Sequence, residues 1–142
     1  ILSALPFTRF IYLPNLLKPD ERPLIGVQIG TRLYATIHAM AGSGNDGPRF
    51  VRMMPVAARL TRASKWLLGG DFNRDPSRYR GFARGTNVWA GGAWTHPSTP
   101  SELDYALSSL RPSRAGARLA ARVMNTPASD HLPVRFDTGY GW

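Results

Sequence analysis

Alternation of apolar and polar positions predicts strands over the first third of the chain. Residues 1–23 are interrupted by four prolines, which is typical of a short strand with loops rather than of a helix. Leu24–Ile29 and Arg32–His38 are rich in aliphatic and β-branched residues, and Gly30-Thr31 separates them. This pattern predicts an antiparallel hairpin with a tight turn, and His38 then lies at the end of its second strand.

The same alternation returns in the second half of the chain. Glu102–Ser109 predicts a strand with Asp104 on the face opposite Tyr105. Two more strands are expected, one over Leu119–Met124 and a final one after the polar triplet Ser129-Asp130-His131.

One segment has the period of a helix. It runs from about Pro48 to Ala63, with Asp46 or Gly47 as the cap of its first turn and Pro55 as a kink or interruption. The apolar residues expected on its buried face are Phe50, Val51, Met54, Ala58 and Leu60. The resulting succession of strand, helix and strand predicts a layered α/β domain.

The stretch Lys65–Pro76 organises the predicted domain. It opens as a buried strand, and two glycines then allow a tight turn, so Asp71 and Asn73 emerge together at the strand's C-terminal end. A carboxylate and an amide so placed suit a divalent cation, a water nucleophile and phosphate oxygens. Taken alone, the segment is equally consistent with an Asx turn that caps a loop.

The composition is that of one folded domain with a basic surface. The 142 residues are 43% hydrophobic, enough for a core, and the absence of cysteine excludes disulfides and thiolate metal sites. A net charge of +9 favours a polyanionic partner, with nucleic acid first and an anionic membrane or an acidic protein second. We expect no transmembrane segment, and the chain as given shows no export signal.

Arginines and aromatic residues are interleaved in a loop-rich segment between residues 77 and 99. This mixture suits a surface that contacts the backbone and bases of a nucleic acid, although aromatics that anchor a loop beneath solvated arginines explain it equally well. His96 has no acidic neighbour in sequence, and we interpret it as a surface histidine. The candidate substrate-binding residues are Arg74, Arg78, Arg80 and Arg84.

Four ordered motifs carry a resemblance to a known family. They are Ile37-His38-Ala39, Gly70-Asp71-Phe72-Asn73, Leu103-Asp104-Tyr105 and Ser129-Asp130-His131-Leu132-Pro133-Val134. In this order they resemble the endonuclease/exonuclease/phosphatase superfamily, which has the deoxyribonuclease I-like fold. The first two motifs are most similar to the nuclease subunits of cytolethal distending toxins and related bacterial proteins. The resemblance covers residues 22–136 and matches the C-terminal half of the family's domain.

This resemblance implies a fold and a reaction. The family's domain is a four-layer α/β sandwich of two packed sheets, of which residues 1–142 would form half, as a single domain with a mixed sheet and flanking helices. Its reaction is metal-dependent hydrolysis of phosphate esters. His131 would act as base or electrostatic partner for the attacking water, with Asp104 orienting its imidazole. Asp71 and Asn73 would hold the water and the scissile phosphate.

The metal site is where the chain departs from the family. By resemblance, Asp130 would help to bind Mg²⁺, or Mn²⁺ or Ca²⁺ in its place, and His38 would bind or protonate a phosphate oxygen. The family's principal metal-binding glutamate lies in its N-terminal half, and neither Glu21 nor Glu102 matches that motif. We therefore expect either that a companion polypeptide carries the N-terminal half, or that the chain is one fragment of a cleaved or truncated precursor.

The resulting hypothesis is a Mg²⁺-dependent DNA endonuclease, secreted or delivered as a bacterial effector, with toxin-complex or inhibitor subunits as possible partners. A phosphoinositide or sphingomyelin phosphohydrolase of the same fold is the first alternative. A non-catalytic half that binds nucleic acid and needs a partner chain is the second.

Overall fold

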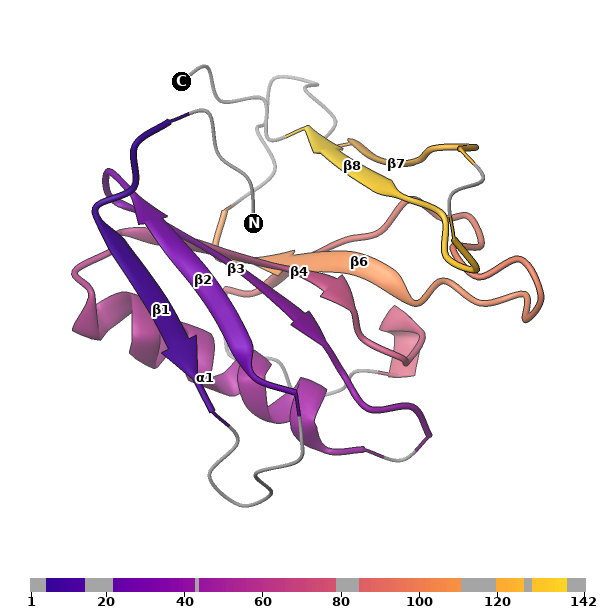
Figure 1. The fold of residues 1–142 in the computed structure, drawn as a ribbon, viewed down its shortest axis with the longest axis horizontal. Coiled ribbons are helices and arrows are strands. Elements are labelled where there is room, and N and C mark those ends of the chain that lie inside the picture. The colour runs from indigo at the N-terminus through magenta and orange to yellow at the C-terminus, as the bar shows by residue number, and fades with distance from the viewer. Residues whose placement is uncertain are drawn as a thin grey trace.

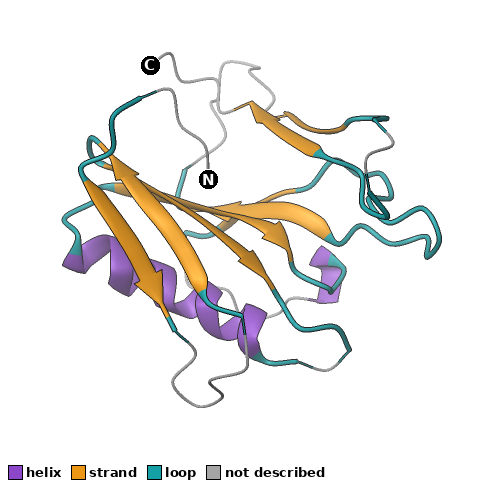
Figure 2. Cartoon of the chain, viewed as in Figure 1, coloured by secondary structure: helices purple, strands orange, loops and turns teal. Residues whose placement is uncertain are grey.

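The computed structural model of the chain describes residues 5–14, 22–42, 44–78, 85–110, 120–126 and 129–137. These residues form strands, one α-helix and a single-turn 3-10 helix (Figure 1; Figure 2 separates helices from strands). In chain order the elements are β1 (Arg9–Leu13), β2 (Leu24–Ile29), β3 (Arg32–His38), α1 (Asp46–Leu60), β4 (Lys65–Asp71), η1 (Pro76–Arg78), β5 (Asn87–Trp89), β6 (Asp104–Ser108), β7 (Ala120–Val123) and β8 (Val134–Asp137).

A mixed sheet of six strands, in the order β1-β2-β3-β4-β6-β5, is the centre of the fold. Strands β3 and β4 are parallel and are joined through α1, whereas every other neighbouring pair in this sheet is antiparallel. Helix α1 covers one face of the sheet, and the β7-β8 hairpin lies over the other (Figure 1). The predicted α/β class, with a mixed sheet and a flanking helix, is therefore confirmed.

The main core lies between α1 and the sheet. Phe50 and Met54 of α1 pack with Leu33, Leu68 and Tyr105 from three strands, and each of these side chains is at most 1% exposed. Alternation along each strand sends every second side chain into this layer, and burial of such side chains contributes about 1.5–3 kcal/mol each. The predicted hairpin of β2 and β3 is confirmed, with Gly30 at a φ of 56° in its turn.

The helix differs from its prediction at both ends. It begins at Asp46, whose buried carboxylate accepts the amide N–H groups of Met40 and Gly47. It ends at Leu60, which is 75% exposed rather than buried, because the last turn leaves the sheet surface. Pro55 lies inside α1 and does not interrupt it. No helix among the described residues has both the length and the apolar character needed to cross a membrane.

The strands near the C-terminus follow the predicted alternation. Tyr105 and Leu107 of β6 face α1, while Asp104 and Ala106 face the β7-β8 side. Strand β7 begins at Ala120, and the predicted start at Leu119 lies outside the described residues. The β7-β8 hairpin reaches the large sheet through Phe136, which packs on Ala106.

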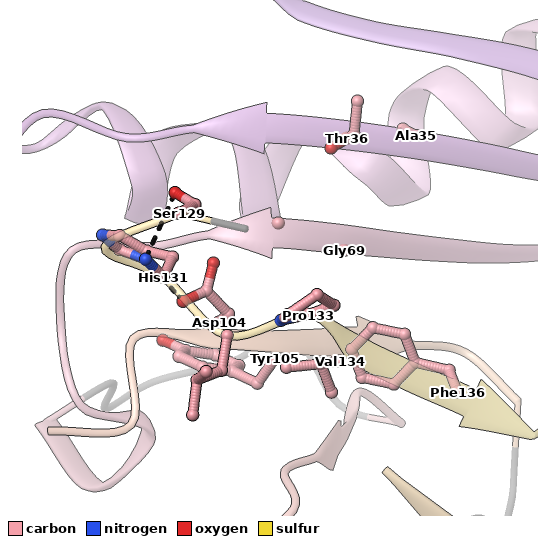
Figure 3. Close-up of a pocket in the computed structure, with 12 residues that line it drawn as sticks. Ala35, Thr36, Gly69, Asp104, Tyr105, Ser129, His131, Pro133, Val134 and Phe136 are labelled. Carbon is pink, nitrogen blue, oxygen red and sulfur yellow. Dashed lines mark hydrogen bonds and ion pairs between the residues drawn. The ribbon is translucent and has the colours of Figure 1, made fainter. Parts of the chain in front are cut away.

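The sheet face opposite α1 carries apolar side chains that remain in contact with solvent. Phe10 and Tyr12 of β1 are 59% and 56% exposed, and they pair with Val27 and Ile25 on the face away from α1. Between this face and β8 lies an open cavity of about 490 Å³, lined mainly by small and apolar residues that include Gly69 (Figure 3). The hairpin thus covers only part of the face.

Gly70 permits the close approach of β3 and β4, so we predict that Gly70→Ala destabilises the domain by about 2–4 kcal/mol. Its φ of 138° is in the region that favours glycine, and an added Cβ would lie 2.1 Å from the carbonyl oxygen of Ile37. Urea unfolding measures the change.

Gly69→Ala is the matched control. A Cβ there would meet no atom closer than 3.8 Å, so we expect a change within about 1 kcal/mol. Equal stability losses in the two variants would contradict the steric explanation.

Candidate functional site

Three polar side chains form one row across three neighbouring strands, at one end of the large sheet. His38 is the register partner of Asp71 in the parallel β3-β4 pair, and Asp71 is the partner of Asp104 in the antiparallel β4-β6 pair. All three point away from α1, because the residues that flank them in sequence face the core. Strands β3 and β4 end where β6 begins, so side chains from three distant parts of the sequence meet at this end of the sheet.

The loop before β8 brings His131 to this row. Its Nδ1 lies 2.7 Å from Oδ2 of Asp104 (Figure 3). Its Nε2 lies 3.9 Å from Oδ2 of Asp71. A carboxylate accepts hydrogen bonds, so the Asp104 contact places the proton of neutral His131 on Nδ1. The Nε2 lone pair then faces the cleft, where it can accept a proton.

Of the two carboxylates in the row, Asp71 makes more hydrogen bonds and ion pairs with the described residues of the site. Its Oδ1 accepts the backbone N–H of Asn73 at 2.7 Å, and its Oδ2 accepts the side-chain amide of Asn73 at 3.0 Å. The same Oδ2 lies 3.3 Å from Nε2 of His38. The Asn73 amide also donates to the carbonyl of Ala39 at 2.7 Å, which ties the ends of β3 and β4 together. An Asx turn is therefore present here, and it is part of the site.

Burial and charge shift two of these groups. Burial raises the pKa of Asp71, and the nearby Asp104 charge adds to this, against the lowering effect of the Asn73 amide and the two histidines. Partial burial lowers the pKa of His131, but the hydrogen bond and charge of Asp104, with Asp71 and Asp130, outweigh it and leave the pKa raised. Perturbed groups that converge in a cleft are typical of functional sites.

The row opens into a cleft of about 440 Å³. Its lining contains the candidate residues of all four sequence motifs, with Arg22 as an additional cation: Arg22, His38, Ala41, Asp71, Asn73, Asp104, Ser129, Asp130 and His131. Sequence reasoning missed Arg22, since a single arginine among sixteen carries no distinguishing signal.

Of the four arginines predicted to bind substrate, the two that the structure describes do not line this cleft. Arg74 donates to the carbonyl of Gly44 at 3.2 Å, and Arg78 ends the η1 turn with its side chain exposed. Arg80 and Arg84 lie outside the described residues. A substrate-binding role for these four arginines stays a prediction.

His96 is not the isolated surface histidine expected from the sequence. Its ring packs edge-on against that of His131, with centroids 4.8 Å apart, and Asp130 lies close to both. Its Nδ1 accepts the backbone N–H of Thr99 at 3.1 Å, which leaves the proton of the neutral ring on Nε2. Its acidic neighbour in space is Asp130, which belongs to a loop distant in sequence.

The cleft fits a hard divalent cation in part. Mg²⁺ prefers oxygen ligands, and Asp130 offers an exposed carboxylate whose pKa is held low by a hydrogen bond from the hydroxyl of Ser129. Among the described residues no glutamate lines the cleft, and Glu102 instead accepts the N–H of Gly92. Asp130 therefore suits one metal ligand, while Asp71 and Asp104 are engaged with histidines.

Known proteins resemble the chain in sequence and in structure. It is 30% identical over 139 residues to the B subunit of cytolethal distending toxin of Escherichia coli, covering 87% of this chain and 51% of that protein. It is 32% identical over 125 residues to the homolog of the same subunit in Salmonella typhi, covering 82% of this chain and 45% of that protein. The chain thus spans about half the length of these curated relatives. No protein-family model matches it.

A solved structure shares the fold. The structure of CdtB, the biologically active subunit of cytolethal distending toxin, superposes with a TM-score of 0.75 at 29% identity, covering 91% of this chain and 56% of that one. The chain has the deoxyribonuclease I-like fold found in the endonuclease/exonuclease/phosphatase superfamily, of which it forms a part. It is homologous to the B subunit of cytolethal distending toxin over about half of that subunit's length.

Asp104→Asn should lower the pKa of His131, because it removes the charge and the acceptor that favour the protonated ring. NMR titration of the His131 ring measures the shift. Because Asp104 raises the pKa of His131 in the folded state, protonation of His131 stabilises the fold at pH values below its unfolded-state pKa. This stabilisation is lost as the pH rises through the folded-state pKa.

The stability gap between wild type and Asp104→Asn should accordingly be larger at about pH 5.5 than at about pH 9. Asp75→Asn is the control, because Asp75 bonds to Ser77 outside the cleft. An unchanged pKa of His131 in Asp104→Asn would overturn this account of the Asp104–His131 pair, hereafter the dyad.

Proposed function

We propose that the chain is the catalytic portion of a metal-dependent phosphodiesterase that hydrolyses DNA. The observation that carries this proposal is the Asp104–His131 hydrogen bond, which leaves Nε2 of His131 free and directed toward Asp71. A base fixed in this tautomer beside a second carboxylate suits the activation of a water molecule for attack on phosphorus.

The reaction divides among the residues of the cleft. His131 takes a proton from the water as the water oxygen bonds to phosphorus, and Asp104 stabilises the imidazolium that forms. The bond from phosphorus to the leaving ester oxygen breaks, and that oxygen departs as an alcohol after it takes a proton from solvent. Asp71 and Asn73 orient the water and the phosphate, and His38 donates a hydrogen bond or proton to a phosphate oxygen. When bound at Asp130, Mg²⁺ supplies positive charge that offsets the charge growing on the phosphoryl oxygens.

DNA is favoured over a phosphoinositide or a sphingomyelin headgroup because of charge. The chain carries 18 lysines and arginines against 9 acidic residues, and attraction to the phosphate backbone dominates non-specific nucleic-acid binding. Toxin subunits are its homologues. Action as a delivered bacterial effector, with other toxin subunits as partners, is therefore part of the proposal.

We also propose that a further polypeptide segment completes the domain. Phe10 and Tyr12 remain exposed on the sheet face opposite α1, and the cavity beside β8 is lined mainly by small and apolar residues, with Asp104 and His131 at its border. A large apolar face rarely stays in water, and curated relatives are about twice as long as the matched region. The companion segment would cover this face and add metal ligands that Asp130 alone does not provide.

His131→Ala and Asp71→Ala should each reduce Mg²⁺-dependent plasmid nicking by roughly 10²-fold or more, since each removes a group that acts on the water or phosphate. Circular dichroism should show both variants folded. Wild-type activity in either variant would exclude the assignment, and a chelator control tests the need for metal.

Completion by a second polypeptide is tested by the intact mass of purified material and by co-expression with an N-terminal half from a homologue. We expect the two halves to co-purify and nicking to rise when they do. Replacing Phe10 and Tyr12 by serine should weaken this association, because both side chains lie on the open face. If the 142-residue chain purifies alone and binds DNA in a salt-sensitive way without cleaving it, the non-catalytic alternative holds.

A further inference from the structure

Thr95 lies in the irregular segment between β5 and β6, yet it is fully buried. A threonine in a loop of glycines and prolines ordinarily lies at the surface. Full burial of a polar side chain costs free energy unless its hydrogen-bonding atoms are satisfied, so the partners of Thr95 indicate what it does.

The Thr95 side chain holds the strand that carries Asp104. Its Oγ1 accepts the backbone N–H of Leu103 at 2.9 Å and that of Asp104 at 3.0 Å. The carbonyl of Leu103 in turn accepts the N–H of Phe72 at 2.9 Å, next to Asp71. One hydroxyl therefore sets where β6 begins relative to the end of β4.

The Thr95 main chain holds the loop that carries His131. Its carbonyl accepts the N–H of Leu132 at 2.7 Å, and its own N–H donates to Ser101 at 3.1 Å, which closes the loop on itself. One residue thus bonds to the backbone of Asp104 and to the residue after His131. These are the two segments whose side chains meet at 2.7 Å.

We propose that Thr95 is a positioning residue, which sets the geometry of the Asp104–His131 pair by fixing both backbones to one point. It touches neither water nor phosphate, and it acts through the dyad. The effect of Thr95 on the rate of hydrolysis rests on the proposed function. Its effect on the geometry of the Asp104–His131 pair does not, because that geometry can be measured without substrate. A shift of about 1 Å at a catalytic base can cost roughly 10²-fold in rate.

Thr95→Val tests the proposal, because valine keeps the shape of the side chain and removes the acceptor. We expect kcat for nicking to fall roughly 10- to 100-fold with KM nearly unchanged. The downfield NMR resonance of the His131 Nδ1 proton, which reports its hydrogen bond to Asp104, should weaken or move upfield. Thr95→Ser retains the hydroxyl, so kcat and the His131 Nδ1 proton resonance should both return most of the way to their wild-type values.

Thr61→Val is the matched control. Thr61 is also buried, and its hydroxyl donates to the carbonyls of Ala57 and Ala58 at the end of α1, on the opposite side of the sheet. It should lower thermal stability without affecting kcat or the His131 resonance. Equal behaviour of Thr95→Val and Thr61→Val would reduce Thr95 to a structural residue and overturn the proposal.

The two proposals can fail separately. If wild type shows no hydrolysis under any condition, the proposed activity is wrong, and the His131 resonance still decides the role of Thr95. If hydrolysis is present and Thr95→Val keeps full kcat with an unaltered resonance, the positioning role is wrong and the activity stands.

Discussion

The register between three strands is the constraint on which the site depends. Parallel pairing of β3 with β4 sets His38 beside Asp71, and antiparallel pairing of β4 with β6 sets Asp71 beside Asp104. A slip of one residue in either pair would turn the side chains of one strand to the opposite face. The buried core against α1 prevents that slip, because it would move apolar residues such as Leu68 into water. The same strand pairing therefore fixes both the packing of the core and the geometry of the candidate site.

Much of this arrangement could be predicted from local sequence pattern. The β2-β3 hairpin, the buried strand ending at Asp71 and the opposite facing of Asp104 and Tyr105 all follow from alternation and glycine placement. Helix ends were harder to predict. The N-cap of α1 is Asn45, and not Asp46 or Gly47 as predicted, and the carboxylate of Asp46 accepts the N–H of Met40 from a loop that sequence pattern does not position. Leu60 matched the apolar period, but it lies past the point where the helix covers the sheet.

In the candidate site too, residues that follow a local sequence pattern could be predicted, and residues placed by contacts between distant segments could not. Residues in motifs at strand ends could be proposed individually, and the motif order supported placing them in one cleft. Thr95, His96 and Arg22 could not be recognised, because their relation to the dyad comes from loop closure between distant segments. Their immediate neighbours in sequence carry no periodic signal, so only the folded chain shows the contacts that single them out.

The open face opposite α1 also bears on how this portion of the fold behaves in solution. Its exposed apolar side chains, Phe10 and Tyr12, belong to β1, whose outer edge has no strand partner among the described residues. Such an edge can recruit a strand from any extended polypeptide nearby, including another copy of the chain. If the proposed companion segment covers this face, synthesis of this portion apart from it would favour self-association, and a cell that produces it would gain from chaperones or from rapid pairing with that segment.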